Sequence, residues 1–194
     1  MARPKDENLK YRILNAASSK FLRSGFSSVP VDEIVAEAGT SKAAVYNFYS
    51  SKEDLVRAVL LMLNDRINLN ISRIVNNNNI PFPSKLEEII RFTSSLLKDV
   101  NTKFLEDLRV QTPAIWKEYL KLREERLNTH YIKLFNDGIQ LGYIRKDVSV
   151  KFLLLVYTKL TEIAVDTSNL KNVKVTKSEA YSLISKLFLE GANP

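Results

Sequence analysis

The stretch Gly39–Leu55, GTSKAAVYNFYSSKEDL, decides the fold because it contains a helix end, a tight turn and two helix starts. Apolar residues at helical spacing precede it, and Gly39 stands where a left-handed residue ends a helix at little cost. Ser41 is placed to accept a hydrogen bond from the free amides of a short new helix. Ser51 and Asp54, three residues apart, are expected to form a capping box for the next, longer helix.

The short middle helix has one small polar face. At about 100° per residue, Lys42, Ala43, Tyr46 and Asn47 share the side opposite the apolar residues. Such a face can enter a major groove roughly 12 Å wide, where Asn pairs with adenine and Tyr and Lys reach phosphates. Lys52 and the free amides beside it form a second phosphate anchor. The expected DNA-binding residues are Ser41, Lys42, Ala43, Tyr46, Asn47 and Lys52, together with Arg3 and Lys5.

These residues resemble the DNA-binding domain of TetR-type transcriptional regulators, over about the first quarter of the chain. The resemblance implies a helix-turn-helix domain at residues 1–52, a ligand-binding and dimerisation domain at 53–194, and a homodimer on a palindromic operator. It implies repression in most cases. The matching residues are Ile13, Ala17, Phe21, Gly25, Phe26, Val31, Ile34, Ala38, Gly39, Ser41, Lys42, Tyr46, Phe48, Tyr49, Lys52 and Glu53.

The chain departs from that family at the start of the second helix and in the recognition helix. Val29 and Pro30 stand where the family has Thr or Ser, so a capping hydroxyl there comes from Ser28 or is missing. Ala43 and Asn47 stand where Gly and His are common. The operator sequence therefore cannot be borrowed from a relative.

The net charge of +7 over 194 residues does not by itself predict DNA binding. Residues 1–54 carry a net charge of +1 and residues 55–194 a net charge of +6. DNA contact by the N-terminal part then depends on individually placed cations. Arg3 and Lys5 form a short basic arm that follows the backbone or enters a minor groove, or else a solvated terminus.

Other protein classes find little support in the sequence. No apolar run approaches the roughly 20 residues of a membrane span, and the N-terminus lacks the apolar core of a signal peptide, so we expect a cytoplasmic protein. The absence of cysteine rules out disulfides and thiolate metal sites. The single histidine, His130, has no catalytic or metal-ligand pattern around it, so we expect neither an enzyme nor a cofactor.

The whole chain is expected to be all-α, with about nine helices and no sheet. Asn76–Asn79, followed by two prolines, is the clearest break. The expected helices span residues 7–24, 30–38, 42–48, 52–75, 84–99, 102–110, 113–139, 148–167 and 176–190.

The last two helices carry more apolar surface than one core face uses. The family resemblance implies that these helices of each subunit form a four-helix bundle across a two-fold axis, which requires such a pattern. A monomer with both helices in its interior is the alternative. The expected dimer residues are Phe152, Val156, Tyr181, Ile184, Leu187 and Phe188.

The family resemblance implies an effector pocket among the middle helices. Aromatic walls with one polar tip suit a long apolar ligand. The net positive charge of residues 55–194 favours an anionic amphiphile, and fatty acyl-coenzyme A is the leading hypothesis. A body that binds a protein partner is the alternative, which a closed, dry pocket would favour. The expected effector residues are Arg91, Leu96, Phe104, Leu108, Arg109, Trp116, Tyr119 and Tyr131.

Overall fold

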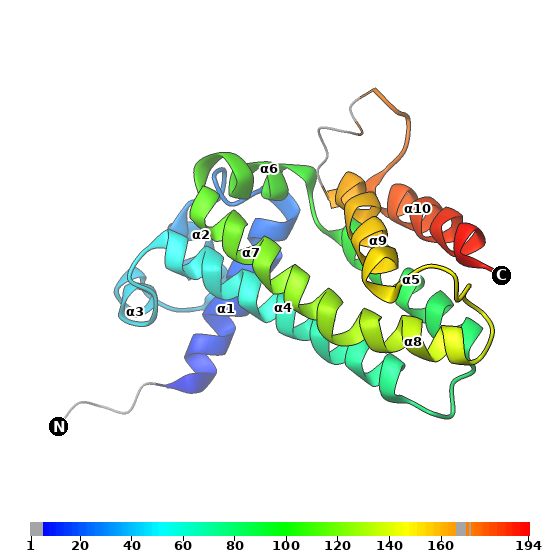
Figure 1. Ribbon diagram of the computed structural model, residues 1–194. Helices are drawn as coiled ribbons and strands as arrows, with labels where there is room; N and C mark the ends of the chain where they lie inside the picture. The colour runs from blue at the N-terminus through cyan, green and yellow to red at the C-terminus, as the bar shows by residue number, and fades with distance from the viewer. Residues whose placement is uncertain (1–5, 166–169, 171) are drawn as a thin grey trace. The chain divides into compact units, whose positions relative to one another are not determined.

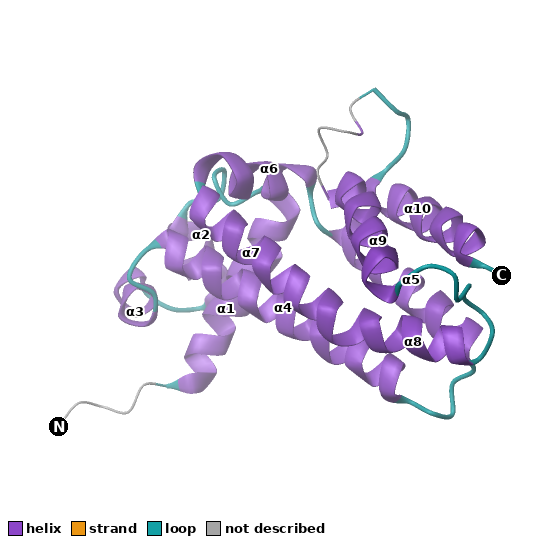
Figure 2. Ribbon diagram, in the orientation of Figure 1, coloured by secondary structure: helices purple, strands orange, loops and turns teal. Residues whose placement is uncertain are grey.

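The computed structural model describes residues 6–165, 170 and 172–194, and the regular elements within them are helices (Figures 1 and 2). The predicted all-α class is confirmed. The elements are α1 (Glu7–Ser24), α2 (Val31–Ala38), α3 (Lys42–Phe48), α4 (Lys52–Asn76), α5 (Phe82–Asp99), α6 (Thr102–Gln111), α7 (Pro113–Arg126), η1 (Leu127–Tyr131), α8 (Ile132–Gln140), α9 (Val150–Val165) and α10 (Lys177–Ala192).

The predicted helix over residues 113–139 is one unbroken helix with a π-helical turn in its middle. α7, η1 and α8 follow one another from Pro113 to Gln140 without a gap, so the described residues form nine continuous helices, as predicted. In η1 the backbone hydrogen bonds join residues five apart instead of four. The residues on either side, Arg126 and Ile132, have ordinary α-helical dihedral angles.

Side-chain caps fix where several helices begin. The Asp6 carboxylate accepts from the Leu9 amide at 3.2 Å at the start of α1. At the start of α10, the Thr176 hydroxyl accepts from the Glu179 amide while the Glu179 carboxylate accepts from the Thr176 amide. Each cap satisfies an amide that has no partner within its own helix.

One compact unit comprises Met1–Leu63 and Val100–Trp116. In it α1 packs against α2, α3 and α6, although α6 is distant in sequence. The connection to α6 is explicit, because the Asn101 amide donates to the Leu22 carbonyl at 2.7 Å and its side chain donates to the Arg23 carbonyl at 2.9 Å. The N-terminal helices therefore share their core with a later segment of the chain.

A buried carboxylate fastens α6 to the loop after α1. Asp107 is 3% exposed, and its Oδ2 accepts from the Ser27 amide at 2.9 Å while Oδ1 accepts from Lys103 at 3.0 Å. Burial alone would raise the pKa of Asp107, but the hydrogen bonds from Ser27 and Lys103 outweigh it and lower the pKa. Gly25, at φ +80°, faces this pair so closely that a Cβ would lie 2.8 Å from the Asp107 carboxylate.

The second compact unit comprises Asn64–Asp99 and Lys117–Pro194. Here α10 packs against α5 and α9, and α9 against α8. Aromatic rings form the centre of its core: the Tyr157 ring lies 5.1 Å from those of Tyr131 and Phe188 and 6.0 Å from that of Phe135. The boundary between the two compact units therefore falls within α4. The boundary expected from the sequence, between a DNA-binding domain at residues 1–52 and a ligand-binding domain at 53–194, separates functions and stays a prediction.

Candidate nucleic-acid interface

The turn between α2 and α3 has the predicted geometry. Gly39 adopts the left-handed conformation, with φ 60° and ψ 49°, and the Thr40 amide donates to the Val35 carbonyl at 3.1 Å. Ser41 Oγ then accepts from the Ala44 amide at 3.1 Å, which caps α3. A sharp change of direction and an immediate restart of the helix are thereby fixed by local chemistry.

The short helix α3 has the predicted two faces. Val45 is 2% exposed and anchors α3 in the core of its unit, with Ala44 and Phe48 half-buried beside it. The opposite side is open to solvent, and Tyr46 is 45% exposed there. The exposed residues on that side are Ser41, Lys42, Ala43, Tyr46 and Asn47, all of them predicted DNA-binding residues.

The cation on this face already has a partner. Lys42 Nζ lies 3.0 Å from Asp32 Oδ1 of α2, and both side chains are mostly exposed. An ion pair this exposed contributes little stability, so a phosphate can take over the lysine at small cost.

The start of α4 provides the second predicted anchor. Ser51 Oγ accepts from the Asp54 amide at 3.0 Å, which is the serine half of the predicted capping box. Lys52 is half-buried; burial lowers its pKa, and nearby Asp107 opposes this effect. Arg3 and Lys5, the predicted basic arm, lie outside the described residues.

The start of α2 lacks a side-chain cap. Pro30 occupies the N-cap position in an extended conformation, and no side chain bonds to the first amides of the helix. The sequence left two alternatives open, a cap by the Ser28 hydroxyl or no hydroxyl cap, and the structure shows the second.

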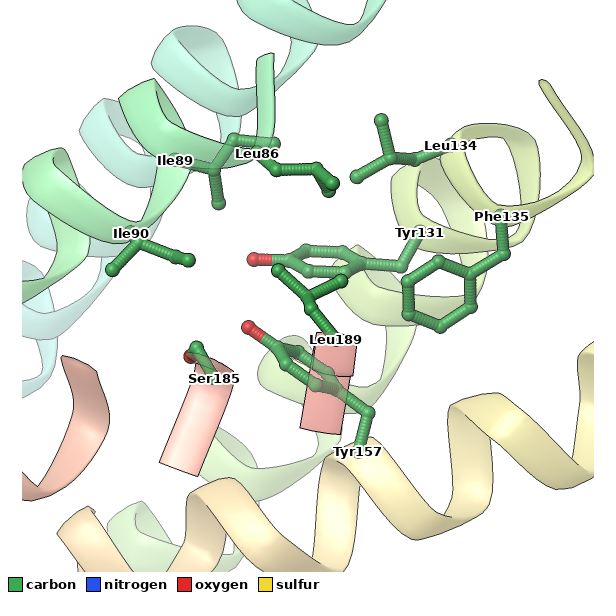
Figure 3. Close-up of a pocket in the computed structure, with 9 residues that line it drawn as sticks. All are labelled: Leu86, Ile89, Ile90, Tyr131, Leu134, Phe135, Tyr157, Ser185 and Leu189. Atoms are coloured by element: carbon green, nitrogen blue, oxygen red, sulfur yellow. The ribbon is translucent and has the colours of Figure 1, made fainter. Parts of the chain in front are cut away.

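The second unit contains a small cavity among α5, η1, α8, α9 and α10 (Figure 3). Its volume of about 10 Å³ gives room for about one water molecule. Most of its walls are apolar. The lining residues are Leu86, Ile89, Ile90, Tyr131, Leu134, Phe135, Tyr157, Ser185 and Leu189.

A group of hydroxyls forms the polar part of this cavity. In Figure 3 the hydroxyls of Tyr131 and Tyr157 point to the same side, toward Ile90 and Ser185. The Tyr157 hydroxyl lies 2.8 Å from that of Tyr181. Ser185 is 1% exposed, and its Oγ lies near the Tyr157 hydroxyl without a hydrogen bond of ordinary geometry to any described residue. An unsatisfied buried hydroxyl is costly, so this one marks a place where a guest or a water would be stabilised.

The predicted effector residues are not all brought together. Tyr131 lines the cavity. Phe104, Leu108, Arg109 and Trp116 belong to the other compact unit, in whose core Phe104 and Leu108 are fully buried. The remaining three, Arg91, Leu96 and Tyr119, lie in the same unit as the cavity, with Arg91 exposed and the other two half-buried.

Two basic residues of the body are buried instead of forming a solvated face. Arg123 Nη2 donates to Thr161 Oγ1 at 2.6 Å. Arg126 Nη1 donates to Asn64 Oδ1 at 2.5 Å, and burial lowers the pKa of its guanidinium. Both arginines are less than 9% exposed, and sequence periodicity gave no sign of it.

The predicted dimer residues divide into two groups. Phe152 and Leu187 are 55% and 67% exposed, whereas Tyr181 and Phe188 are buried within the single chain. Val156 and Ile184 are half-buried. Three further apolar residues on these helices are exposed and were not predicted: Leu155, Ile163 and Leu183.

The described residues contain neither a metal-binding cluster nor a membrane-spanning helix. No three His, Cys, Asp or Glu side chains within them are grouped closely enough to hold a metal ion. None of the helices that they form is long and apolar enough to cross a membrane.

Residues 13–59 match the sequence model of the family described as "Bacterial regulatory proteins, tetR family". The HTH-type transcriptional repressor SCO4008 of Streptomyces coelicolor is 25% identical over 183 residues, which cover 93% of this chain and 90% of that protein. An uncharacterised HTH-type transcriptional regulator of Bacillus subtilis, YdeS, is 25% identical over 142 residues, or 65% of this chain and 72% of that one.

Solved structures support the fold. A transcriptional regulator from Cytophaga hutchinsonii superimposes with a TM-score of 0.73 at 17% identity, covering 97% of this chain and all of the other. Residues 13–59 are thus similar to the N-terminal part of tetR-family regulators, both relatives are named as transcriptional regulators, and the likeness to the solved structure concerns the fold.

Proposed function

We propose that this protein is a homodimeric repressor that leaves a palindromic operator when an apolar or amphipathic effector enters its body. The observation that carries the proposal is the exposed polar face of α3, held at a capped turn after Gly39. Fatty acyl-coenzyme A is the proposed effector. As a DNA-binding regulator, the protein would act in the cytoplasm.

The DNA-binding part of the proposal is supported by the chemistry of α3. Ala43 lets the backbone approach the base edges, and Asn47 can pair bidentately with an adenine. Tyr46 and Lys42 flank them and can reach phosphates. Because a seven-residue helix reads few base pairs, two copies on successive major grooves would provide the affinity.

The dimer is supported by an apolar row on the last two helices. Phe152, Leu155 and Ile163 are exposed at helical spacing on α9, and Leu183 and Leu187 lie one turn apart on α10. Exposed apolar residues gathered on adjacent helices are typical of an interface. We therefore propose that this row, more than the buried Tyr181 and Phe188, faces the second subunit.

The effector is supported by the cavity and its unsatisfied hydroxyl at Ser185. Burial raises the pKa of the wall residue Tyr131 well above its usual value, and the nearby Arg126 acts in the opposite sense. A cation beside an apolar cavity suits an anionic amphiphile. An acyl chain is far larger than one water molecule, so it would bind only if the surrounding helices move apart.

The small volume of the cavity favours one alternative, a body that binds a protein partner. The two possibilities differ in a direct experiment. DNA fragments that the protein binds would be selected from random sequence and from its own upstream region, and complexes would then be titrated with acyl-coenzyme A of several chain lengths.

Saturable binding of acyl-coenzyme A to the protein, with release of operator at one range of chain lengths, is the expected result. Release at every chain length without saturable binding would indicate a detergent effect and would refute the acyl-coenzyme A proposal. Failure to select any DNA would refute the repressor itself.

A further inference from the structure

Two asparagines one turn apart on α4 bond to two residues one turn apart on the neighbouring helix. Arg126 Nη1 donates to Asn64 Oδ1 at 2.5 Å, and His130 Nε2 lies 2.8 Å from Asn68 Oδ1. Because an amide oxygen only accepts, the His130 proton is on Nε2. Burial, with Arg126 nearby, lowers the pKa of His130, which favours this neutral ring. Figure 1 shows the two helices running in the same direction.

The same turn that bonds to α4 also forms a wall of the cavity. Arg126 is the last residue of α7, and His130 lies in the π-helical segment η1. The next residue, Tyr131, lines the cavity and stacks near Tyr157 with ring centres 5.1 Å apart. Within six residues the chain therefore contacts α4 on one side and the cavity on the other.

A π-helical turn is well suited to change between two states. It contains one residue more per turn than an α-helix needs, and such turns are rare and often occur at functional sites. Conversion of η1 to regular α-helix would rotate the residues on one side of it by about 100° relative to those on the other. Arg126 precedes η1, whereas the cavity-wall residues Leu134 and Phe135 follow it, so the conversion would turn that wall relative to the guanidinium that bonds to Asn64.

We propose that Asn64 and Asn68 are positioning residues that transmit a change in the cavity to α4 through Arg126, His130 and η1. The inference rests on the proposed function, because it names the regulation of the same cavity. α4 runs without a break from Asn68 back to Lys52, next in the chain to the recognition helix. An occupant that presses on Tyr131 would favour one arrangement of η1, and the two hydrogen bonds would impose that arrangement on α4.

A purely structural role makes a different prediction. If the hydrogen bonds only fasten two helices, removing them lowers stability by the same amount whether or not the cavity is filled. If they carry coupling, the effect of filling the cavity on DNA binding depends on their presence. A double-mutant cycle separates the two cases.

Ser185→Leu is the cavity probe, because the added side chain exceeds the room for one water molecule. Operator affinity is measured by fluorescence anisotropy for this variant, for Asn64→Ala/Asn68→Ala, and for the combination. Asn70→Ala is the matched control, since Asn70 lies on the same helix and its side chain donates to the Arg66 carbonyl of that helix at 2.9 Å. Ser185→Val replaces Ser185→Leu if thermal melting shows that the larger side chain prevents folding.

We expect the cavity probe to weaken operator binding at least about fivefold in the wild-type and Asn70→Ala backgrounds. In the Asn64→Ala/Asn68→Ala background we expect less than about a twofold change. An equal loss in all backgrounds, or no loss from the cavity probe, would overturn the coupling.

Failure of the proposed function is distinguishable, because no operator would then be selected. In that case amide hydrogen exchange at residues 64–68 is measured in the same variants. Faster exchange caused by the cavity probe, with no further increase once the asparagines are replaced, supports the coupling. The same increase in every background refutes it.

Discussion

Lys42 of α3 and Asp32 of α2 form an ion pair, with Nζ 3.0 Å from Oδ1, on the face that we propose contacts DNA. The pair holds the lysine away from a phosphate in the free protein. Because both side chains are mostly exposed, the pair is weak and screened by salt. Its main effect should therefore be on DNA binding.

Asp32→Asn is expected to raise operator affinity about two- to fivefold, because it frees Lys42 and removes a negative charge near the phosphates. Glu33→Gln is the matched control: Glu33 neighbours Asp32 on α2 but pairs with Lys20, at 3.4 Å. Affinity measured at several salt concentrations checks the prediction. Equal gains from both variants would mean that general charge, and not release of Lys42, is responsible.

Asn47→Ala is expected to relax preference at one base pair, at a cost of about 1 to 3 kcal/mol on the preferred operator. The reason is that an exposed amide on the α3 face can read a base edge. Tyr46→Phe, which removes the proposed phosphate contact, should instead weaken binding to all DNA sequences alike. Selection from random DNA with each variant tests this, and uniform losses for Asn47→Ala would contradict its role as a base reader.

Much of the fold could be predicted because its signals are local. Gly39, Ser41 and Ser51 fix helix ends through backbone and capping chemistry that needs no distant partner. The exposed face of α3 followed from periodicity for the same reason. Interactions between residues far apart in the sequence were not predicted. Examples are the attachment of α6 through Asp107 and the buried hydrogen bond of Arg126.

The candidate effector site was less accessible to sequence reasoning. Aromatic residues at helical spacing predict burial but not which core they enter, and Phe104 lies in a different unit from Tyr131. Ser185, the most informative residue of the cavity, is a small polar residue in an amphipathic helix and carries no signal by itself. Likewise, nothing in the sequence LNTHY predicts a π-helical turn.

Gly138→Ala should destabilise the protein by about 1 to 3 kcal/mol, because a Cβ there would overlap the Phe82 ring and lie 2.8 Å from Ile144 Cδ1. Gly191→Ala is the matched change in another helix. It has open space around it and should stabilise the protein by about 0.5 kcal/mol. Denaturant unfolding of both variants is the measurement, and equal effects would refute the close contact at Gly138.

Asp107→Asn should lower the free energy of unfolding by about 1.5 to 3 kcal/mol at neutral pH, because a charged acceptor of buried hydrogen bonds is lost. The pKa of Asp107 is lowered in the folded state, so its contribution is present above the unfolded value of 3.8 and is lost as pH falls through the folded value. The gap between wild type and variant should therefore close in acid. A gap that stays constant from pH 7 to pH 3 would show that the carboxylate charge contributes nothing.

Leu187→Glu should convert the proposed dimer to a monomer, because Leu187 is 67% exposed and belongs to the apolar row on α9 and α10. A charge buried there would be unpaired, at a cost of several kcal/mol per interface. Val110→Glu is the control, since Val110 on α6 is 71% exposed but lies outside that row. Sedimentation should show a dimer for the wild type and Val110→Glu, and a monomer with weakened operator binding for Leu187→Glu. A dimer in all three would place the interface elsewhere, and a monomeric wild type would remove the two-fold reading of DNA on which the repressor depends.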